Sequence, residues 1–187
     1  MKTNALKTIF LSILLILSVA VVARAASSDL KKADRLFSQG KCSEALPLYQ
    51  KMLADPKARI SAGDIHARIG DCHFRLQDYP NAATSYRAAL PKQKVSQQPV
   101  TQYWIGFSIF AQGRDEEAIS EFLKIPQLYP ASGMWVSTAY YWAGRASERL
   151  GNKDQAAVYY RKAGGAGKAS QEQFALKRAE AVKASSK

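Results

Sequence analysis

The sequence is poor in the residues that build most metal centres and nucleophilic active sites. It holds two histidines and two cysteines in 187 residues, and neither histidine lies near a glycine-flanked serine. His66 and His73 would be about 10 Å apart along one helix, too far to bind a single metal ion. Their place within a predicted helix favours a packing role. We therefore expect no catalytic residue, no metal site, no cofactor and no enzymatic activity.

Glycine is concentrated in one stretch, GGAGKAS at 164–170, which matches a phosphate-binding loop only in part. That motif requires a glycine five residues before Gly167, where Lys162 stands. It also requires a serine or threonine after the lysine, where Ala169 stands. The sequence therefore predicts no nucleotide site in this stretch.

Long apolar runs are absent after residue 22. The run at 9–22 is shorter than the roughly 20 residues that a helix needs to cross a bilayer. It follows a short basic segment and precedes the small residues Ala23 and Ala25, a pattern typical of a secretory signal peptide. We expect cleavage near Ala25/Ala26, export of the remainder, and no membrane span after cleavage. Because no cysteine follows the run, we expect no lipid at the new amino terminus.

Acidic residues are few beside the basic ones. The chain has 27 Lys and Arg against 15 Asp and Glu, a net charge of +12, and loss of residues 1–25 would leave 24 basic residues and +9. Residues 161–187 hold seven basic and two acidic residues and so contribute +5. A basic chain can bind nucleic acid. An exported chain with a basic tail instead favours an acidic partner, an anionic surface or peptidoglycan, or a tail that is only solvated; we expect no nucleic acid partner.

The chain is rich in self-similarity. Residues 140–163, YYWAGRASERLGNKDQAAVYYRKA, read as two helices joined by a turn at Gly151. A pattern of four positions recurs in four copies. It consists of a small residue, a turn residue, a second small residue and an aromatic residue. The copies are Gly144, Gly151, Ala156 and Tyr160; Gly106, Gly113, Ala118 and Phe122; Gly70, Gln77, Ala82 and Tyr86; and Ala33, Gly40, Ala45 and Tyr49. The near-constant period of about 37 residues predicts an all-α solenoid of helical hairpins.

The hairpins fix the expected domain boundaries. A signal peptide at 1–25 precedes a solenoid at 26–163, and a glycine-rich turn, a capping helix and the basic tail occupy 164–187. The four repeats are expected at about 26–56, 61–91, 99–130 and 132–163, with the polar break at 91–99 as a hinge or an insertion. In the last helix, the residues expected to cover the end of the solenoid are Phe174, Ala175, Ala179 and Val182.

The repeats resemble the tetratricopeptide family. The resemblance is carried by Gly106, Gly113, Ala118, Phe122 and Pro130, and by the matching positions of the neighbouring copies. It covers about residues 29–163 and implies a right-handed superhelix of about four hairpins. The period, longer than the usual 34 residues, and Leu-Tyr-Pro at 128–130 are similar to bacterial envelope members. Examples are the Tol–Pal-associated cell-division coordinator and outer-membrane assembly lipoproteins.

The resemblance also implies a binding groove, because the first helices of such arrays line a concave face. The positions that point into it here are Phe37, Asp71, Phe74, Arg75, Tyr103, Phe107, Phe110, Tyr141, Arg145 and Arg149. For Phe107 and Phe110 a packing role between repeats remains an alternative. Trp104, Trp142 and Tyr140 fall off the groove positions, and we expect them to pack between repeats.

Cys42 and Cys72 fall in the first two repeats, where they could meet across the interface between hairpins. An exported location permits a disulfide, but sequence cannot establish the Cα separation of about 5.5 Å that one requires. A Cys42–Cys72 disulfide and two separate buried thiols both remain open.

The function that these features imply is a non-catalytic periplasmic scaffold. It would bind a segment of another envelope protein in the groove, in cell-envelope assembly, division or peptidoglycan machinery. One alternative is a glycan- or peptidoglycan-binding accessory module, because residues 140–151 resemble the superhelical, non-catalytic part of soluble lytic transglycosylases. The other is a structural protein that associates with itself through the aromatic face.

Overall fold

The computed structural model describes residues 28–55, 61–166 and 169–184 of the chain. The predicted signal peptide and the last three residues of the basic tail lie outside these ranges. Within them, no helix is both long enough and apolar enough to cross a membrane.

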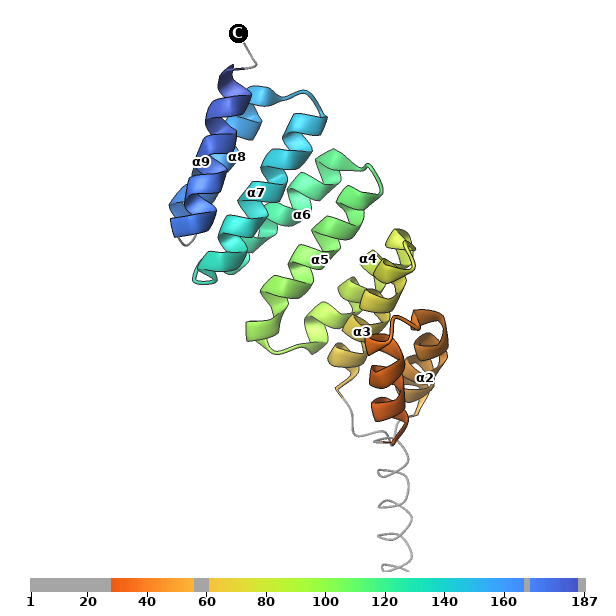
Figure 1. Ribbon diagram of the computed structural model, residues 1–187. Coiled ribbons are helices and arrows are strands. Elements are labelled where there is room, and N and C mark those ends of the chain that lie inside the picture. Colours follow the sequence, from red (N-terminus) through yellow and green to blue (C-terminus); the bar gives the residue numbers. More distant parts are fainter. Residues whose placement is uncertain (1–27, 56–60, 167–168, 185–187) are drawn as a thin grey trace, which may run out of the picture.

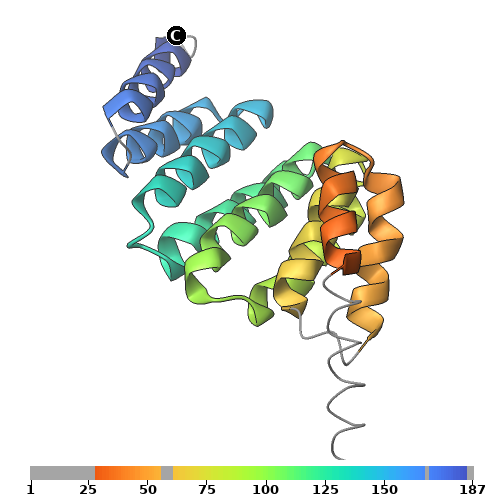
Figure 2. The ribbon, with the colours of Figure 1, turned by 60° about the horizontal axis from the view of Figure 1, so that its bottom comes forward.

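The described chain is an all-α, right-handed superhelical solenoid. Helices pair in chain order into four antiparallel hairpins, and a ninth helix packs on the last of them. The pairs are 28–38 with α2 (Cys42–Ala54), α3 (Ala62–Arg75) with α4 (Tyr79–Ala89), α5 (Gln98–Ala111) with α6 (Asp115–Leu128), and α7 (Gly133–Arg149) with α8 (Lys153–Ala166). The hairpins stack into an elongated staircase, with α9 (Ala169–Ala184) at the end far from the first helix (Figures 1 and 2).

The turn inside each hairpin depends on one residue with left-handed backbone. Gly40, Gly113 and Gly151 have φ of 78°, 80° and 79°, a region that favours glycine because it lacks a Cβ. In the second hairpin this place belongs to Gln77, with φ of 61°. A side chain in that conformation costs about 1 kcal/mol. The second hairpin therefore has the least relaxed turn of the four.

Glycine in the first helix of a hairpin lets the second helix approach closely. A Cβ placed on these glycines would lie only 2.7–2.8 Å from the nearest carbon of an aromatic ring. The glycine–ring pairs are Gly70 with Tyr86, Gly106 with Phe122, and Gly144 with Tyr160. Ala33 occupies this position in the first hairpin and is fully buried. The small residue and the aromatic of the repeat pattern are thus packing partners across each hairpin.

The polar break at 91–99 is anchored to the start of α3. It forms two 3₁₀ turns, with bounds Leu90–Lys92 and Val95–Gln97. The Gln97 amide donates a hydrogen bond of 3.1 Å to Asp64, and Lys92 Nζ lies 3.1 Å from His66 Nε2. These contacts favour an ordered insertion over a hinge.

Helix α8 corrects one predicted boundary. A glycine-rich turn was expected from residue 164, but α8 continues through Gly164 and Gly165 to Ala166. The Ser137 hydroxyl of α7 donates a hydrogen bond of 2.8 Å to the carbonyl of Ala163, and Gly164 is buried. Close packing against α7 therefore holds the glycines in the helix.

Helix α9 covers the end of the solenoid with small side chains. Ala175, Ala179 and Val182 are buried, as expected for a cap. Phe174 was expected among them but is 59% exposed, with its ring centroid 5.8 Å from that of Tyr141. One residue is about 100° around a helix. Phe174 therefore lies to one side of buried Ala175, where its ring contacts Tyr141 of the last hairpin while remaining largely exposed.

Candidate partner-binding surface

Aromatic side chains from α3, α5 and α7 form a continuous row, which we call the aromatic ladder. Its members are Phe74, Tyr103, Phe107, Phe110, Trp142 and Tyr141. The Phe107 centroid lies 5.6 Å from those of Phe74 and Tyr103, and 6.1 Å from that of Phe110. The row continues from Phe107 to Trp142 at 4.5 Å and from Trp142 to Tyr141 at 5.8 Å. These are ordinary stacked and edge-to-face separations, so the rings form one connected surface across three hairpins.

Each ladder residue is partly exposed and partly packed against the core. Tyr103 illustrates this, because its ring lies 6.1 Å from buried Phe122 while it remains accessible. Burial raises the pKa of Tyr103 to about 12, so the phenol is neutral at physiological pH. Rigid rings with one packed face and one open face offer contact area at little entropic cost. The ladder therefore has the character of a protein-binding surface.

Two arginines join neighbouring hairpins in the same way. Arg75 Nη1 donates to the carbonyl of Phe37 at 2.8 Å, and its guanidinium carbon lies 3.8 Å from the centre of the Phe37 ring. Arg149 Nη2 donates to the carbonyl of Phe110 at 2.6 Å, and its guanidinium carbon lies 3.9 Å from the centre of the Phe110 ring. Both carbonyls are at the carboxyl end of a helix, where a cation is favoured. We call these two contacts the arginine clamps.

The second clamp also holds a buried carboxylate. Asp115, at the start of α6, is 5% exposed. It accepts hydrogen bonds from Arg149 Nε at 2.8 and 2.6 Å and a further one from Nη2. This fork-to-carboxylate geometry is stronger than a single charged contact. Removing Arg149 would leave the Asp115 charge buried without its partner.

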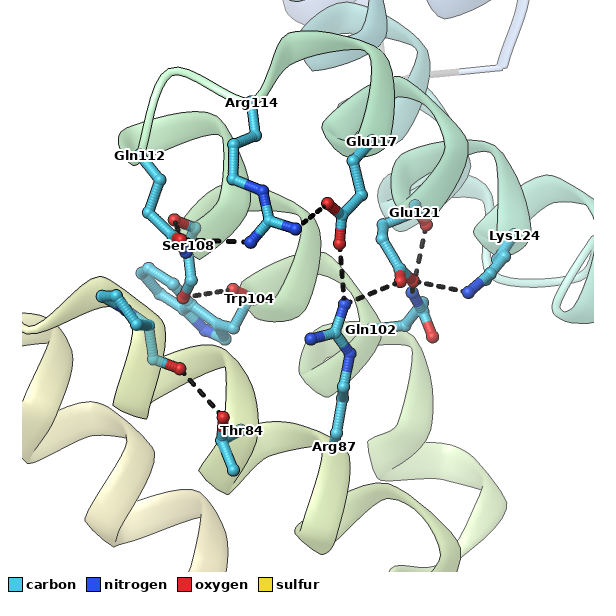
Figure 3. Close-up of polar contacts among 11 residues, drawn as sticks. Thr84, Arg87, Gln102, Trp104, Ser108, Gln112, Arg114, Glu117, Glu121 and Lys124 are labelled. Atoms are coloured by element: carbon cyan, nitrogen blue, oxygen red, sulfur yellow. Dashed lines mark hydrogen bonds and ion pairs between the residues drawn. The ribbon is translucent and has the colours of Figure 1, made fainter.

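The interface between α4 and α6 is joined by a different polar network (Figure 3). Glu121, 7% exposed, accepts hydrogen bonds from Arg87 at 3.1 Å, Gln102 at 2.8 Å and Lys124 at 2.7 Å. Burial alone would raise the pKa of Glu121, but the hydrogen bonds from Lys124, Gln102 and Arg87 outweigh it and lower the pKa. Glu121 is therefore ionised and fixed in place between the second and third hairpins.

Asp71, predicted to face the groove, is bound within its own hairpin. Its carboxylate accepts a hydrogen bond of 2.8 Å from the Tyr86 hydroxyl, and Asp34 accepts one of 2.7 Å from Tyr49 at the equivalent place in the first hairpin. Burial raises the pKa of Asp71, and the hydrogen bond from Tyr86 opposes that rise. The half-buried Asp71 side chain therefore joins α3 to α4 and does not point freely into the predicted groove.

Arg145 lies beside the ladder, and its ion pair with Glu148 leaves it partly exposed. Its side chain is 41% exposed, and its Nη1 donates to the Tyr141 hydroxyl at 3.5 Å. The guanidinium carbon lies 5.9 Å from the Trp142 ring, and Nε lies 3.8 Å from a Glu148 oxygen. Glu148 itself is held by Tyr160 and by Arg178 of α9, at 2.8 Å for the latter. Arg145 thus places an accessible cation at the carboxyl-terminal end of the ladder.

The structure divides the ten predicted groove residues by role. Five of them, Phe74, Tyr103, Phe107, Phe110 and Tyr141, belong to the ladder. Three more form the arginine clamps: Arg75 binds Phe37, and Arg149 binds the carbonyl of Phe110. Asp71 serves its hairpin, and Arg145 stands beside the ladder.

Sequence reasoning missed one member of the ladder. Trp142 was expected to pack between repeats, and its ring does lie against Phe107 and Phe110 of the preceding hairpin. It also completes the exposed row as far as Tyr141. The sequence did contain a signal for this role. Trp142 precedes Gly144 by two residues, as Trp104 precedes Gly106, so the two tryptophans occupy equivalent repeat positions.

Cys42 and Cys72 are free thiols in this structure, 1% and 0% exposed. They belong to the same buried cluster, between α2 and α3. The two thiols are neighbours rather than separate, and a disulfide between them stays a prediction.

Comparison with known proteins gives the family of these repeats. Three tetratricopeptide repeat models match the chain, at residues 30–99, 101–132 and 137–163. No curated protein sequence gives a significant match.

Two solved structures share the fold. A crystal structure of MamA is 18% identical, covers 82% of this chain and 95% of its own, and has a TM-score of 0.59. The MamA RS-1 ArsTM double mutant is 16% identical, covers 86% and 96%, and has a TM-score of 0.61. At this identity the likeness concerns the fold alone, and the three matching models, together with the hairpin geometry, show that the chain belongs to the tetratricopeptide repeat family.

Proposed function

We propose that this chain is a non-catalytic scaffold of the bacterial periplasm that binds a segment of another envelope protein along the aromatic ladder. A tetratricopeptide solenoid is a scaffold for protein–protein interaction. The observation that carries the proposal is the ladder itself, six partly exposed rings that are contiguous across three hairpins. A core residue would bury such a ring fully, as Tyr86, Phe122 and Tyr160 are buried.

The charges around the ladder suggest the chemistry of the partner. Beyond the amino-terminal end of the ladder, the Arg68 side chain is 46% exposed, with its guanidinium carbon 5.5 Å from the Phe37 ring and its Nε 3.8 Å from Asp34. At the other end Arg145 lies beside Trp142. Both ends therefore present accessible cations, whereas the middle is apolar. A complementary segment has aromatic or aliphatic side chains in its centre and acidic residues on its flanks.

Export and the envelope role rest on the sequence. The leader pattern at 1–25 supports periplasmic location, and the similarity to envelope members of the family supports a role in envelope assembly, division or peptidoglycan machinery. The basic tail adds a second contact in this proposal, because Lys177 and Lys183 of α9 are exposed. They would meet an anionic surface or peptidoglycan while the ladder holds the protein partner.

The test is site-specific crosslinking from the end of the ladder. A benzoyl-phenylalanine replaces Phe174, whose ring is 59% exposed and lies against Tyr141. The same residue replaces Leu128 as a control, since Leu128 is 61% exposed on α6, away from the ladder. We expect the Phe174 probe, and not the Leu128 probe, to capture one envelope protein through an apolar segment with acidic flanks.

Other outcomes would replace this proposal with a different one. Crosslinks only between copies of this chain would indicate self-association through the aromatic face. Attachment to glycan strands without a protein would favour the peptidoglycan-binding alternative. Equal capture from both probes would contradict binding at the ladder.

A further inference from the structure

The two cysteines lie together in the interface between the first two hairpins. Cys42 begins α2 and Cys72 lies in the last turn of α3, and both are at most 1% exposed. The two side chains are within hydrogen-bonding contact in a shared apolar cluster that also contains Ala45, Tyr49 and Ile69.

We propose that Cys42 and Cys72 form a disulfide in the exported protein, which fastens the first hairpin to the rest of the solenoid. The inference uses the export proposed above but is independent of what the ladder binds. In the reaction, the two thiols lose two protons and two electrons to the disulfide of a small molecule or an oxidoreductase. That disulfide is reduced to two thiols, and one sulfur–sulfur bond replaces another.

The position in the solenoid explains what the bond would do. An end hairpin packs against one neighbour only, so it opens more readily than an inner hairpin. The opposite end has α9 as a cap, held by the ion pair of Arg178 with Glu148. At the amino-terminal end, the contacts across the first interface include the exposed Arg75 clamp, an ion pair of 3.8 Å between Arg68 and Asp34, both partly exposed, and the apolar cluster around the cysteines. A covalent link there would protect the end that lacks a capping helix within the described residues.

Burial sets the timing of the reaction. The pKa of the Cys72 thiol is raised to about 12, by burial first and by the neighbouring Cys42 next. Only the thiolate attacks a disulfide, so exchange in the folded, reduced protein would be very slow. The bond must form while the first hairpin is still open, during folding or during transient opening. Once buried, it would resist reductants for the same reason of access.

The geometry is tested by refolding the mature chain, residues 26–187, in a buffer of reduced and oxidised glutathione. We expect the mass to fall by two hydrogens, with a Cys42–Cys72 crosslinked peptide after digestion. Two free thiols, a mixed disulfide with glutathione, or bonds only between molecules would overturn the proposal. This arm does not depend on export or on a partner, so its failure is distinct from failure of the proposed scaffold function.

The consequence is tested by amide hydrogen exchange of residues 28–55 in protein refolded under oxidising conditions and in protein refolded and kept in reductant. Closing a loop of about 30 residues should slow exchange there by on the order of 100-fold, whereas α7 and α8 should not change. In Cys42→Ala and Cys72→Ala variants the dependence on reductant should disappear. An oxidised protein whose first hairpin exchanges faster than the reduced one would contradict the proposal. So would protein extracted from the envelope with both thiols free to alkylation in denaturant.

Discussion

The interfaces between hairpins are of two kinds, and the difference separates cohesion from binding. The first and third interfaces have arginine clamps, in which Arg75 and Arg149 bind the carbonyl at the end of the preceding first helix. The second interface has no such clamp. Ala111 occupies the repeat position that Arg75 and Arg149 hold elsewhere, although Phe74 is present at the position equivalent to Phe37 and Phe110. Aromatic rings and the Glu121 network join this interface instead.

The comparison also shows where the ladder lies among the interfaces. Phe74 meets Trp104 at 5.1 Å and Phe107 at 5.6 Å across the second interface. The equivalent contact at the third interface, Phe110 with Trp142 at 5.3 Å, forms beneath the Arg149 clamp. Ladder rings therefore join the second and third interfaces, where cohesion and recognition share side chains. The Arg75 clamp of the first interface lies outside the ladder.

The largest expected effect is loss of the central packing. Trp104 contacts Phe74, Tyr86, Tyr103 and Phe107, so Trp104→Ala should lower the free energy of unfolding by about 3 kcal/mol. Trp104→Phe should recover much of that loss because it retains a ring. Urea titration followed by circular dichroism measures both. Equal, small losses in the two variants would contradict the central role of this packing.

The next effect distinguishes the two clamps. Arg149→Ala should cost about 2–3 kcal/mol because it leaves Asp115 buried without its partner, whereas Arg75→Ala should cost about 1 kcal/mol because no carboxylate depends on it. Arg149→Lys, which keeps the charge but not the fork, should fall between wild type and Arg149→Ala. Equal losses for Arg75→Ala and Arg149→Ala would show that the Asp115 contact adds nothing.

A smaller effect should appear in the pH dependence of the central interface. The folded-state pKa of Glu121 is lowered, so its contribution is fully present above the unfolded pKa, near 4.5, and is lost as pH falls through the folded value. The stability difference between wild type and Glu121→Gln should therefore shrink below about pH 4.5. Thermal melts from pH 7 to pH 3 measure it. A difference that grows on acidification would contradict the assigned direction.

The smallest effect is a gain. Ala111→Arg would supply the clamp that the central interface lacks, with the Phe74 carbonyl and ring as its targets, and should stabilise the chain by about 0.5–1 kcal/mol. Ala111→Gln is the matched control, since it adds length without charge. If the arginine variant is no more stable than the glutamine variant, the two kinds of interface do not differ by the clamp.

The fold could be predicted from the sequence because the packing of each hairpin depends on residues that are close in the chain and recur in every repeat. Gly106 and Phe122 have the same separation as Gly144 and Tyr160, and both pairs meet across a hairpin. The helix bounds of α6 and the capping role of Ala175 also follow from local patterns. The end of α8 did not follow, because tertiary contact with Ser137 holds two glycines in the helix against their intrinsic preference.

The candidate binding surface was only partly predictable, because some of its side chains are held by residues far away in the sequence. The pattern located Phe74, Phe107 and Tyr141 on the first helices. It could not show that Arg75 and Arg149 are bound to carbonyls more than 35 residues away. Whether an arginine faces a ligand or a neighbouring helix depends on the exact stagger of two hairpins, which a one-residue difference in turn length alters.

The most direct test is partner capture by two arginine variants, measured as the crosslinking yield from the Phe174 probe at a temperature well below both melting points. If the ladder binds and the clamps only join hairpins, Arg145→Ala should reduce capture about 10-fold with an unchanged melting temperature. Arg75→Ala should leave capture within about twofold although it lowers the melting temperature. Equal losses of capture, or a loss confined to Arg75→Ala, would contradict the separation of binding from cohesion.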